Sequence, residues 1–388
     1  MSSIIKVDTI QDQAGNNIIN ESGNTITIGA SGDTITIPSG ATFTNSGTTS
    51  AITISGALTV DGGTIKLDGN YPTGTSNLGF GDNALCSITS GARFNTAIGN
   101  NALCTHTSND KNTAVGNQAL RDNTGGCNTA VGHDSMVNNG AGQCNVAVGH
   151  GSLSNNTTGD FNTAVGFNAL NSNTTGEPNT AVGFCALEAN TTGVNSTAVG
   201  ANTLINATSA NNNTAIGSCA LNAATTAANN TAVGFSALDT LTTGCENVAV
   251  GRDTMFAGTT ACRNVAVGYR ALKSVETAAN NVGVGYHALC TNTTGAGNTA
   301  IGKDALDSNT TGDDNVAIGL DALQANTTAD SNVAVGRTAL QGNTTGTANV
   351  AVGRNALLSN TTASNNTAVG FCSLNGNTTG DLNTAIGT

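Results

Sequence analysis

The most regular feature of the chain is a five-residue segment in which two kinds of position alternate. Its consensus is Asn-Thr/Val-Ala-Val/Ile-Gly, and it returns from the Gly81 region to the end of the chain. Most intervals between successive motif glycines share one 17-residue length; the first is one residue longer and the third is one residue shorter. Alternation with a period of two is typical of a β-strand. The sequence therefore predicts one short strand in each repeat.

Two further positions recur in each unit. Leucine stands four residues after each motif glycine, except for Met136 and Met255, so we expect this position to be buried in every unit. An Asn-Thr-Thr-Gly segment follows it, and we read this as a turn because Asn and Gly tolerate positive φ. Both length exceptions fall in this segment, as expected for a turn.

A single repeat is too short to bury its own apolar face. The pattern therefore predicts an all-β fold, a β-solenoid with 17-residue coils stacked at about 4.8 Å, so that some 18 coils make a rod roughly 85 Å long. We expect Val/Ile, Thr/Val and Leu to fill the interior, and the motif asparagines to form an amide ladder between coils. Representatives of these structural columns are Asn112, Asn162, Asn230, Asn298, Asn366, Leu170, Leu238 and Leu306.

The segment 1–72 follows a different pattern. Short Thr-Ile-Thr-Ile strands are expected near residues 24–29 and 33–38, with many Gly and Ser turns between them. We predict two parts, a β-rich attachment segment over residues 1–72 and a solenoid shaft over residues 73–388. The last residues stop partway through a motif, so we expect either that the chain is truncated there or that a downstream element has been removed or is supplied by a partner.

Composition narrows the function classes. Charged residues are 9% of the chain, aromatics are 3%, and the net charge is −12. This excludes a nucleic-acid binder that works through a basic surface. We find no secretory signal and no apolar stretch long enough for a transmembrane helix, so we expect synthesis in a cytosol and no membrane insertion.

The repeats resemble those of phage tail-fibre and related surface-fibre proteins. The residues that carry the resemblance are units such as Asn162-Thr-Ala-Val-Gly-Phe-Asn-Ala-Leu170 followed by Asn173-Thr-Thr-Gly176. The opening Ser3-Ile-Ile-Lys-Val-Asp-Thr-Ile-Gln11 is similar to openings of tail-fibre-like virion proteins from phages of marine cyanobacteria. The motif also resembles the head repeat of trimeric autotransporter adhesins, a left-handed parallel β-roll. Neither a C-terminal chaperone domain nor an autotransporter's signal and anchor is found, and the latter absence favours the phage family.

The resemblance implies a parallel homotrimer. The alanine at the third motif position is nearly invariant, with Gly283 the exception, and it points away from the Val/Ile face. Uniform smallness at this position indicates close approach of another surface. We favour a sister chain over the alternative, a tight stack within one chain.

The residues that directly follow the motif glycines form a variable column, which we call the post-glycine column. Variable size and charge indicate exposure, and six of the 12 aromatics of the chain stand here. Such a face is suited to contact with glycans or another protein, but we favour an inter-subunit seam or mere surface decoration. Its members include His133, His150, Phe167, Phe184, Phe235, Arg252, Tyr269, Tyr286, Lys303, Arg337, Arg354 and Phe371.

Groups that would carry chemistry are sparse. No nucleophile–base constellation is found, so we predict no enzyme and no cofactor. His133 and His150 stand one coil apart, which is compatible with a metal site, but we favour surface histidines and predict no metal. Three cysteine pairs are also one coil apart, and a cytosolic origin favours free thiols over disulfides. These pairs are Cys86/Cys104, Cys127/Cys144 and Cys245/Cys262.

Together these features predict a structural shaft of a phage tail fibre or whisker. Residues 1–72 would attach it to the virion, and the solenoid would project toward the host surface. Expected partners are further copies of the chain, other tail or baseplate proteins, and a host receptor or polysaccharide. The alternatives are a bacterial surface adhesin or glycan-binding solenoid, and an ice-binding solenoid whose Thr-rich coils present a flat array.

Overall fold

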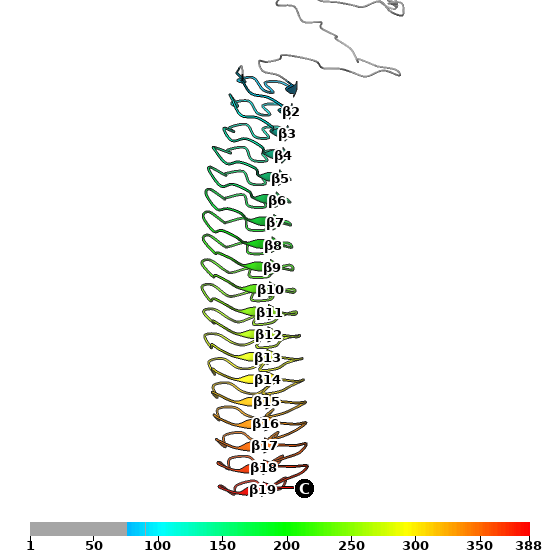
Figure 1. Ribbon diagram of the computed structural model, residues 1–388, viewed down its shortest axis with the longest axis vertical. Helices are drawn as coiled ribbons and strands as arrows, with labels where there is room; N and C mark the ends of the chain where they lie inside the picture. Colours follow the sequence, from blue (N-terminus) through cyan, green and yellow to red (C-terminus); the bar gives the residue numbers. More distant parts are fainter. Residues whose placement is uncertain (1–75, 90) are drawn as a thin grey trace, which may run out of the picture. The chain divides into compact units, whose positions relative to one another are not determined.

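The structure describes a β-solenoid built from one parallel sheet and the loops that connect its strands (Figure 1). In the computed structural model, residues 76–89 and 91–388 are described, and no helix is present among them. The predicted segment 1–72 and its boundary to the shaft lie outside these residues. The strands are β1 (Leu78–Phe80), β2 (Thr96–Ile98), β3 (Thr113–Val115), β4 (Thr129–Val131), β5 (Val146–Val148), β6 (Thr163–Val165), β7 (Thr180–Val182), β8 (Thr197–Val199), β9 (Thr214–Ile216), β10 (Thr231–Val233), β11 (Val248–Val250), β12 (Val265–Val267), β13 (Val282–Val284), β14 (Thr299–Ile301), β15 (Val316–Ile318), β16 (Val333–Val335), β17 (Val350–Val352), β18 (Thr367–Val369) and β19 (Thr384–Ile386).

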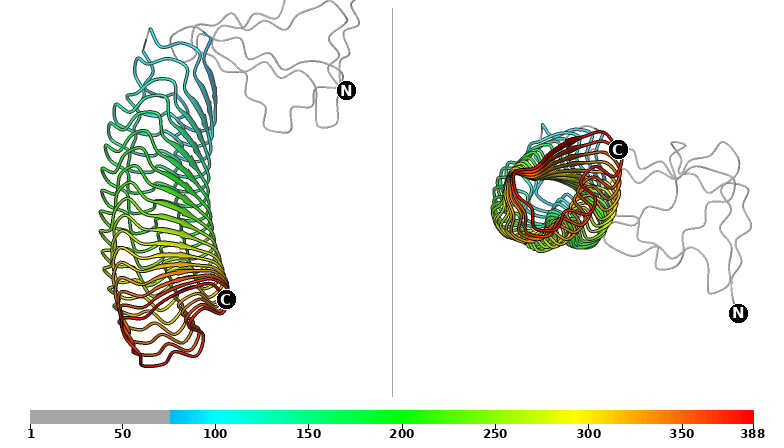
Figure 2. Two further views of the ribbon diagram at one scale, coloured as in Figure 1. Left: turned by 60° about the horizontal axis from the view of Figure 1, so that its bottom comes forward. Right: turned by 90° about the horizontal axis from the view of Figure 1, so that it is seen from below.

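Each strand pairs in parallel with the strands of the coils before and after it. Thr231 of β10, for example, lies opposite Thr214 of β9 and Val248 of β11. Seen along the axis, the coils lie over one another with a gradual rotation (Figure 2). The predicted all-β solenoid with 17-residue coils is confirmed.

The motif glycine makes the sharp turn at the end of each strand. Its φ lies between +121° and +143° in all 19 coils, a region that disfavours side chains. A Cβ on Gly166 would also come within 2.3 Å of the carbonyl oxygen of Gly183 in the next coil. Glycine is therefore required here both by the backbone angle and by the coil spacing.

The prediction of which strand face points inward was wrong. Every motif alanine from Ala97 to Ala368 is 0% exposed, whereas the flanking Val/Ile positions lie outside, with Ile98 37% and Ile216 41% exposed. The physical reason is the thinness of the coil. Where Gly283 replaces the alanine, even a Cβ would come within 3.2 Å of Cγ of Leu272 in the preceding coil. The interior accepts only alanine beside the leucine, and the β-branched residues favour the extended strand from outside.

This orientation decides between the two explanations for the uniform alanine. The alanines contact the interior of their own chain, so the tight stack within one chain accounts for them. They are not evidence for a sister chain.

The motif asparagines form a ladder through the interior. Oδ1 of Asn230 accepts hydrogen bonds from both the backbone N–H and Nδ2 of Asn247, each at 3.0 Å. Nδ2 of Asn247 also donates to the carbonyl of Ala261, at 2.7 Å. Because each asparagine satisfies buried backbone groups of the next coil, it closes the stack without a polar group left unpaired.

The asparagines of the Asn-Thr-Thr-Gly segments form a second buried column, where the sequence predicts only turn chemistry. Nδ2 of Asn173 donates to Oδ1 of Asn156 at 2.9 Å, and both side chains are buried. Neither these asparagines nor the glycines that follow them has positive φ. Positive φ falls instead on the buried Leu/Met position, between 46° and 55° in every coil, on the residue two before it, and in most coils on the residue before the motif asparagine. Glycine is favoured in this segment for another reason, because a Cβ on Gly159 would lie 2.5 Å from the carbonyl oxygen of Gly176.

Candidate functional site

The post-glycine column runs along the outside of the solenoid. Its residues follow the turn at the end of each strand, and stacking of the coils repeats them at the strand spacing. Phe167, Phe184, Phe235 and Phe371 are about half exposed, and Tyr286 is 47% exposed. Arg252, Lys303, Arg337 and Arg354 are exposed as well, and Tyr269 is partly buried.

Aromatic residues of this column form a continuous stack over four coils. The ring centroids of His133, His150, Phe167 and Phe184 are separated in turn by 5.2, 5.2 and 5.4 Å, with planes within 12° of parallel. Coil spacing alone sets these distances. The ring faces therefore lie against one another, and the ring edges line the outside of the shaft.

A second run combines aromatic and cationic side chains. The guanidinium of Arg252 lies 5.7 Å from the ring centroid of Phe235 and 6.0 Å from that of Tyr269. Tyr269 and Tyr286 stack at 5.4 Å, and Nζ of Lys303 lies 5.9 Å from the ring centroid of Tyr286. Arg354 and Phe371 repeat the cation–ring arrangement at 5.9 Å. Exposed ring edges and cationic side chains together are suited to contact acidic groups or sugar hydroxyls.

The outward strand positions extend this surface. Ile301 is 40% exposed and Val250 is 36% exposed, although both are β-branched apolar residues. We call the two outward positions of each strand, together with the post-glycine column, the outer strip. It follows the sheet through all described coils. The sequence predicted the exposure of the post-glycine column but not that of the strand positions, because hydrophobicity assigned Val and Ile to the interior.

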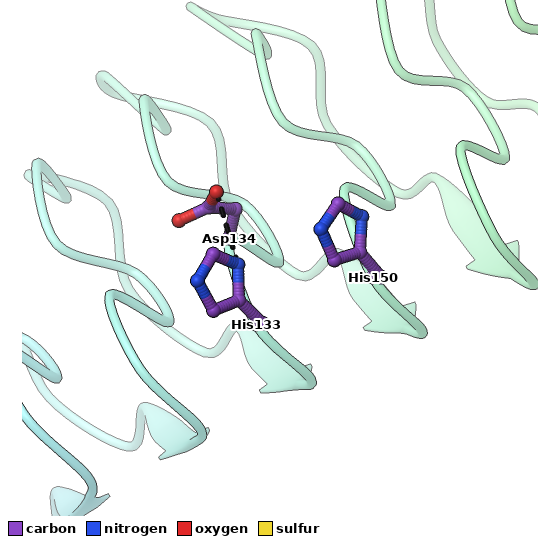
Figure 3. Close-up of side chains that lie close together, drawn as sticks. All are labelled: His133, Asp134 and His150. Atoms are coloured by element: carbon purple, nitrogen blue, oxygen red, sulfur yellow. Dashed lines mark ion pairs between the residues drawn. The ribbon is translucent and has the colours of Figure 1, made fainter.

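His133 and His150 lie close to a carboxylate (Figure 3). Nδ1 of His133 is 3.0 Å from Oδ2 of Asp134, and one donor atom from each of the three residues lies within 4.8 Å of the others. The two imidazole planes are 3° apart, so their nitrogens face the same way rather than toward each other. Both histidines are exposed.

A second cluster of ligand-type groups lies deeper, between the coils of β13 and β14. It consists of His287, Cys290 and Asp307, whose donor atoms lie within 4.8 Å of one another, and all three are half-buried. Nδ1 of His287 is 3.9 Å from Oδ1 of Asp304. Burial, followed by the charge of Asp307, raises the pKa of Cys290, and burial, followed by the charge of Asp304, raises the pKa of Asp307.

The ten cysteines are free thiols. Two of the predicted pairs bring their sulfurs together, with Sγ–Sγ distances of 2.7 Å for Cys86/Cys104 and 2.8 Å for Cys245/Cys262. Burial and the hydrogen bond to Cys86 raise the pKa of Cys104 to about 11. The third pair, Cys127/Cys144, is exposed, and the pKa of Cys144 is raised by burial and then by the charge of Cys127 and a hydrogen bond to it.

Sequence reasoning missed the second cluster for a specific reason. Comparison of the repeats at one position at a time does not pair these residues, because His287 stands two residues and Cys290 stands five residues after the motif glycine. The signal is their spacing of three positions, combined with Asp304 and Asp307 at the same two positions of the following repeat.

Comparison with known proteins adds no family. No protein-family model matches the chain, and no curated protein is significantly similar to it in sequence. In the described part of the chain, no helix is long and apolar enough to cross a membrane.

Proposed function

We propose that the chain is the shaft of an extracellular fibre, as in the tail fibre or whisker of a phage particle. The observation that carries this proposal is the uninterrupted ladder from β1 to β19, in which each strand pairs in register with the next. Strand spacing of about 4.8 Å makes this ladder a rod roughly 85 Å long. A rod of this kind holds a contact-making end at a fixed distance from its base.

Stiffness follows from the direction of the hydrogen bonds. In the described coils, the strand amides and many turn amides bond to the neighbouring coils, and the buried leucines and asparagines stack along the same axis. Bending the rod would open these bonds on its convex side. The shaft therefore acts mechanically, as a spacer between the virion and the host surface.

The outer strip supports self-association of the shaft. Soluble monomers rarely expose contiguous apolar patches larger than a few hundred Å². Here outward Val, Ile and Phe residues recur in coil after coil on one face. Parallel copies that meet along this face would bury it, in the homotrimer implied by the resemblance to fibre proteins. Other tail or baseplate proteins and a host receptor or polysaccharide are the further partners of this proposal.

Two measurements test the proposal together. Negative-stain images are expected to show rods, and light scattering is expected to give three chains per particle. Val250→Glu with Val267→Glu, on the outer strip, should lower the mass to one chain while the rods persist. Thr243→Glu, at an exposed turn position outside the strip, is the matched control and should leave the mass unchanged. Compact globules in the images would overturn the proposal of a shaft. A wild-type mass of one chain would overturn the proposal of a trimer.

The run of aromatic and cationic residues favours a second candidate, a shaft whose side binds host polysaccharide. Tyr269→Ala with Tyr286→Ala should then weaken cell binding while the rod persists. Loss of binding together with a fall in mass would instead assign these residues to a seam between chains.

Ice binding is less well supported. The first threonine of the repeated turns, such as Thr157 and Thr174, donates its hydroxyl to a backbone carbonyl of the next coil at 2.8–2.9 Å. These hydroxyls are therefore already engaged, and a thermal-hysteresis assay is expected to be negative.

A further inference from the structure

Three metal-ligand side chains, His287, Cys290 and Asp307, meet at one place on the solenoid, and Asp304 lies 3.9 Å from the first of them. His287 and Cys290 come from the turn after β13, and Asp304 and Asp307 stand at the same two positions one coil later. The turn itself brings the first two together, since the backbone N–H of Cys290 donates to the carbonyl of His287 at 3.3 Å. Parallel stacking then sets Asp307 beside Cys290, and the backbone N–H of Thr291 donates to the carbonyl of Asp307 at 3.1 Å.

The histidine ring is held in place and has a free nitrogen. It stacks on Tyr286 with centroids 4.0 Å apart, and the ring of Tyr269 is 5.7 Å away on the preceding coil. Nε2 of His287 is buried and has no hydrogen-bond partner among the described residues. A buried imidazole nitrogen without a partner is uncommon, because desolvating it costs free energy that a bond normally offsets. A bound cation is one way to satisfy it.

The neighbouring cations do not fill the cluster. Nζ of Lys303 is 2.8 Å from Oδ2 of Asp304 and is therefore engaged at the edge. Arg270, on the preceding coil, lies over the ring of Tyr269 and is 3.6 Å from a carboxylate oxygen of Asp253. Among the described residues, Asp307 takes part in no ion pair. The charges of Lys273 and Arg270 oppose the rise in the pKa of Cys290, so both cations lie near the half-buried thiol.

We propose that His287, Cys290 and Asp307 bind a divalent zinc ion, with Asp304 or a water as the fourth ligand. Zinc accepts sulfur, imidazole and carboxylate together in tetrahedral geometry, and the hard cations calcium and magnesium do not favour sulfur. Tetrahedral zinc keeps its ligand atoms about 3.3–3.8 Å apart. The donor atoms here lie within 4.8 Å of one another. Side-chain rotations that move these atoms by about 1 Å would therefore close the site around the ion.

The exposed cluster of His133, Asp134 and His150 is the weaker candidate. Its imidazoles are parallel, and Nδ1 of His133 already contacts Asp134 at 3.0 Å. It contains no sulfur. This difference makes it a useful internal control, because a cobalt probe reports a bound thiolate by its charge-transfer absorption.

The test is a titration of the full chain with Co²⁺ and then Zn²⁺ under reducing conditions. We expect one cobalt per chain with a thiolate-to-cobalt charge-transfer band in the near ultraviolet, lost when zinc displaces it. Cys290→Ser should abolish the band. His287→Ala and Asp307→Asn should each weaken apparent affinity by at least about tenfold.

Two controls keep the outcome interpretable. His133→Ala with His150→Ala should leave the band and affinity unchanged, and Cys372→Ser should do the same for a cysteine elsewhere. Circular dichroism and rod images show whether each variant is folded. At the same zinc concentration, zinc should raise the thermal midpoint of wild type more than that of Asp307→Asn, which retains every cysteine. A band that survives Cys290→Ser, binding unchanged by Asp307→Asn, or no cobalt binding by wild type would overturn the proposal.

Discussion

Replacing the interior alanine of β10 with valine tests whether the alanine face of the strand points inward. Ala232 in β10 is 0% exposed, and its neighbours in the ladder are Ala215 and Ala249. Valine adds two methyl groups. If there were room, burying them would stabilise the fold by about 1.6 kcal/mol, at roughly 0.8 kcal/mol for each carbon.

The coil has no such room. At the equivalent position of β13, a Cβ on Gly283 would already lie 3.2 Å from Cγ of Leu272 and 3.3 Å from the carbonyl oxygen of Ala288. Overpacking a well-packed core typically costs about 1–3 kcal/mol. We therefore expect Ala232→Val to destabilise its coil by about 1–3 kcal/mol, which corresponds to roughly 5- to 150-fold faster exchange of the protected amides there.

Native-state hydrogen exchange is the suitable assay, because stacked repeats lose stability locally rather than as one unit. The amides of β9, β10 and β11 should lose protection, and those of distant coils should not. Thr231→Val is the matched control: it lies on the outer face of the same strand, where the next coil already has Val248, so its effect should stay within about 0.5 kcal/mol. Unchanged exchange in Ala232→Val would mean that the alanines face outward after all.

Three further predictions concern Asn298, Gly234 and Cys104. Asn298→Ala removes the acceptor for the backbone N–H of Asn315, at 3.0 Å, and the donor to a turn carbonyl, so it should cost about 2–4 kcal/mol by hydrogen exchange. Asn298→Ser should cost less, because Ser196, at the same motif position, accepts the corresponding hydrogen bond from the backbone N–H of Asn213. Gly234→Ala sets a Cβ 2.4 Å from the carbonyl oxygen of the next motif glycine at a φ of +138°, and limited proteolysis should then cut near this coil but not in wild type. The pKa of Cys104, raised to about 11 by burial and the bond to its partner, predicts alkylation at neutral pH at least about tenfold slower than for a free thiol. Because the unfolded chain loses this proton first, stability should fall as the pH rises from about 9 toward 11. Alkylation at the rate of a free thiol, or stability that rises over this range, would contradict the raised pKa.

The period and the strand could be read from the sequence because each depends on local chemistry. Alternation over five residues sets an extended segment, and regular recurrence of an apolar residue such as Leu170 sets a buried column. The strand pattern and the buried column both recur over 18 units. Neither prediction depends on the width of the coil.

Which strand face points inward could not be read in the same way. Hydrophobicity favours Val and Ile over Ala for the interior, and the prediction rested on it. The outcome depends on coil width instead, because a thin coil with one leucine has space beside it only for a methyl group. Exposed residues such as Ile216 and Ile301 are the consequence of that geometry, and their exposure is visible only in three dimensions.

The turn asparagines carry a signal that comparison of single columns does not use. They occur in two runs, broken where Ala207, Ala224, Leu241, Gly258 and Val275 occupy the same position. An amide in the interior needs an amide neighbour, so runs are expected and isolated members are not. The runs could therefore have distinguished a buried ladder from an exposed turn.

The same ladder gives the rod an electrical direction. In the turn column, Nδ2 of Asn173 and Nδ2 of Asn190 each donate to Oδ1 of the asparagine one coil before, so these amide dipoles point the same way along the shaft. Where a run stops, at Asn190, its Oδ1 is left buried without a donor. A segment or partner that continues such a column on its oxygen side must bring a hydrogen-bond donor, and one that continues it on the opposite side must bring an acceptor. The two directions along the shaft are thus chemically distinct at every coil, which favours assembly with all chains pointing the same way.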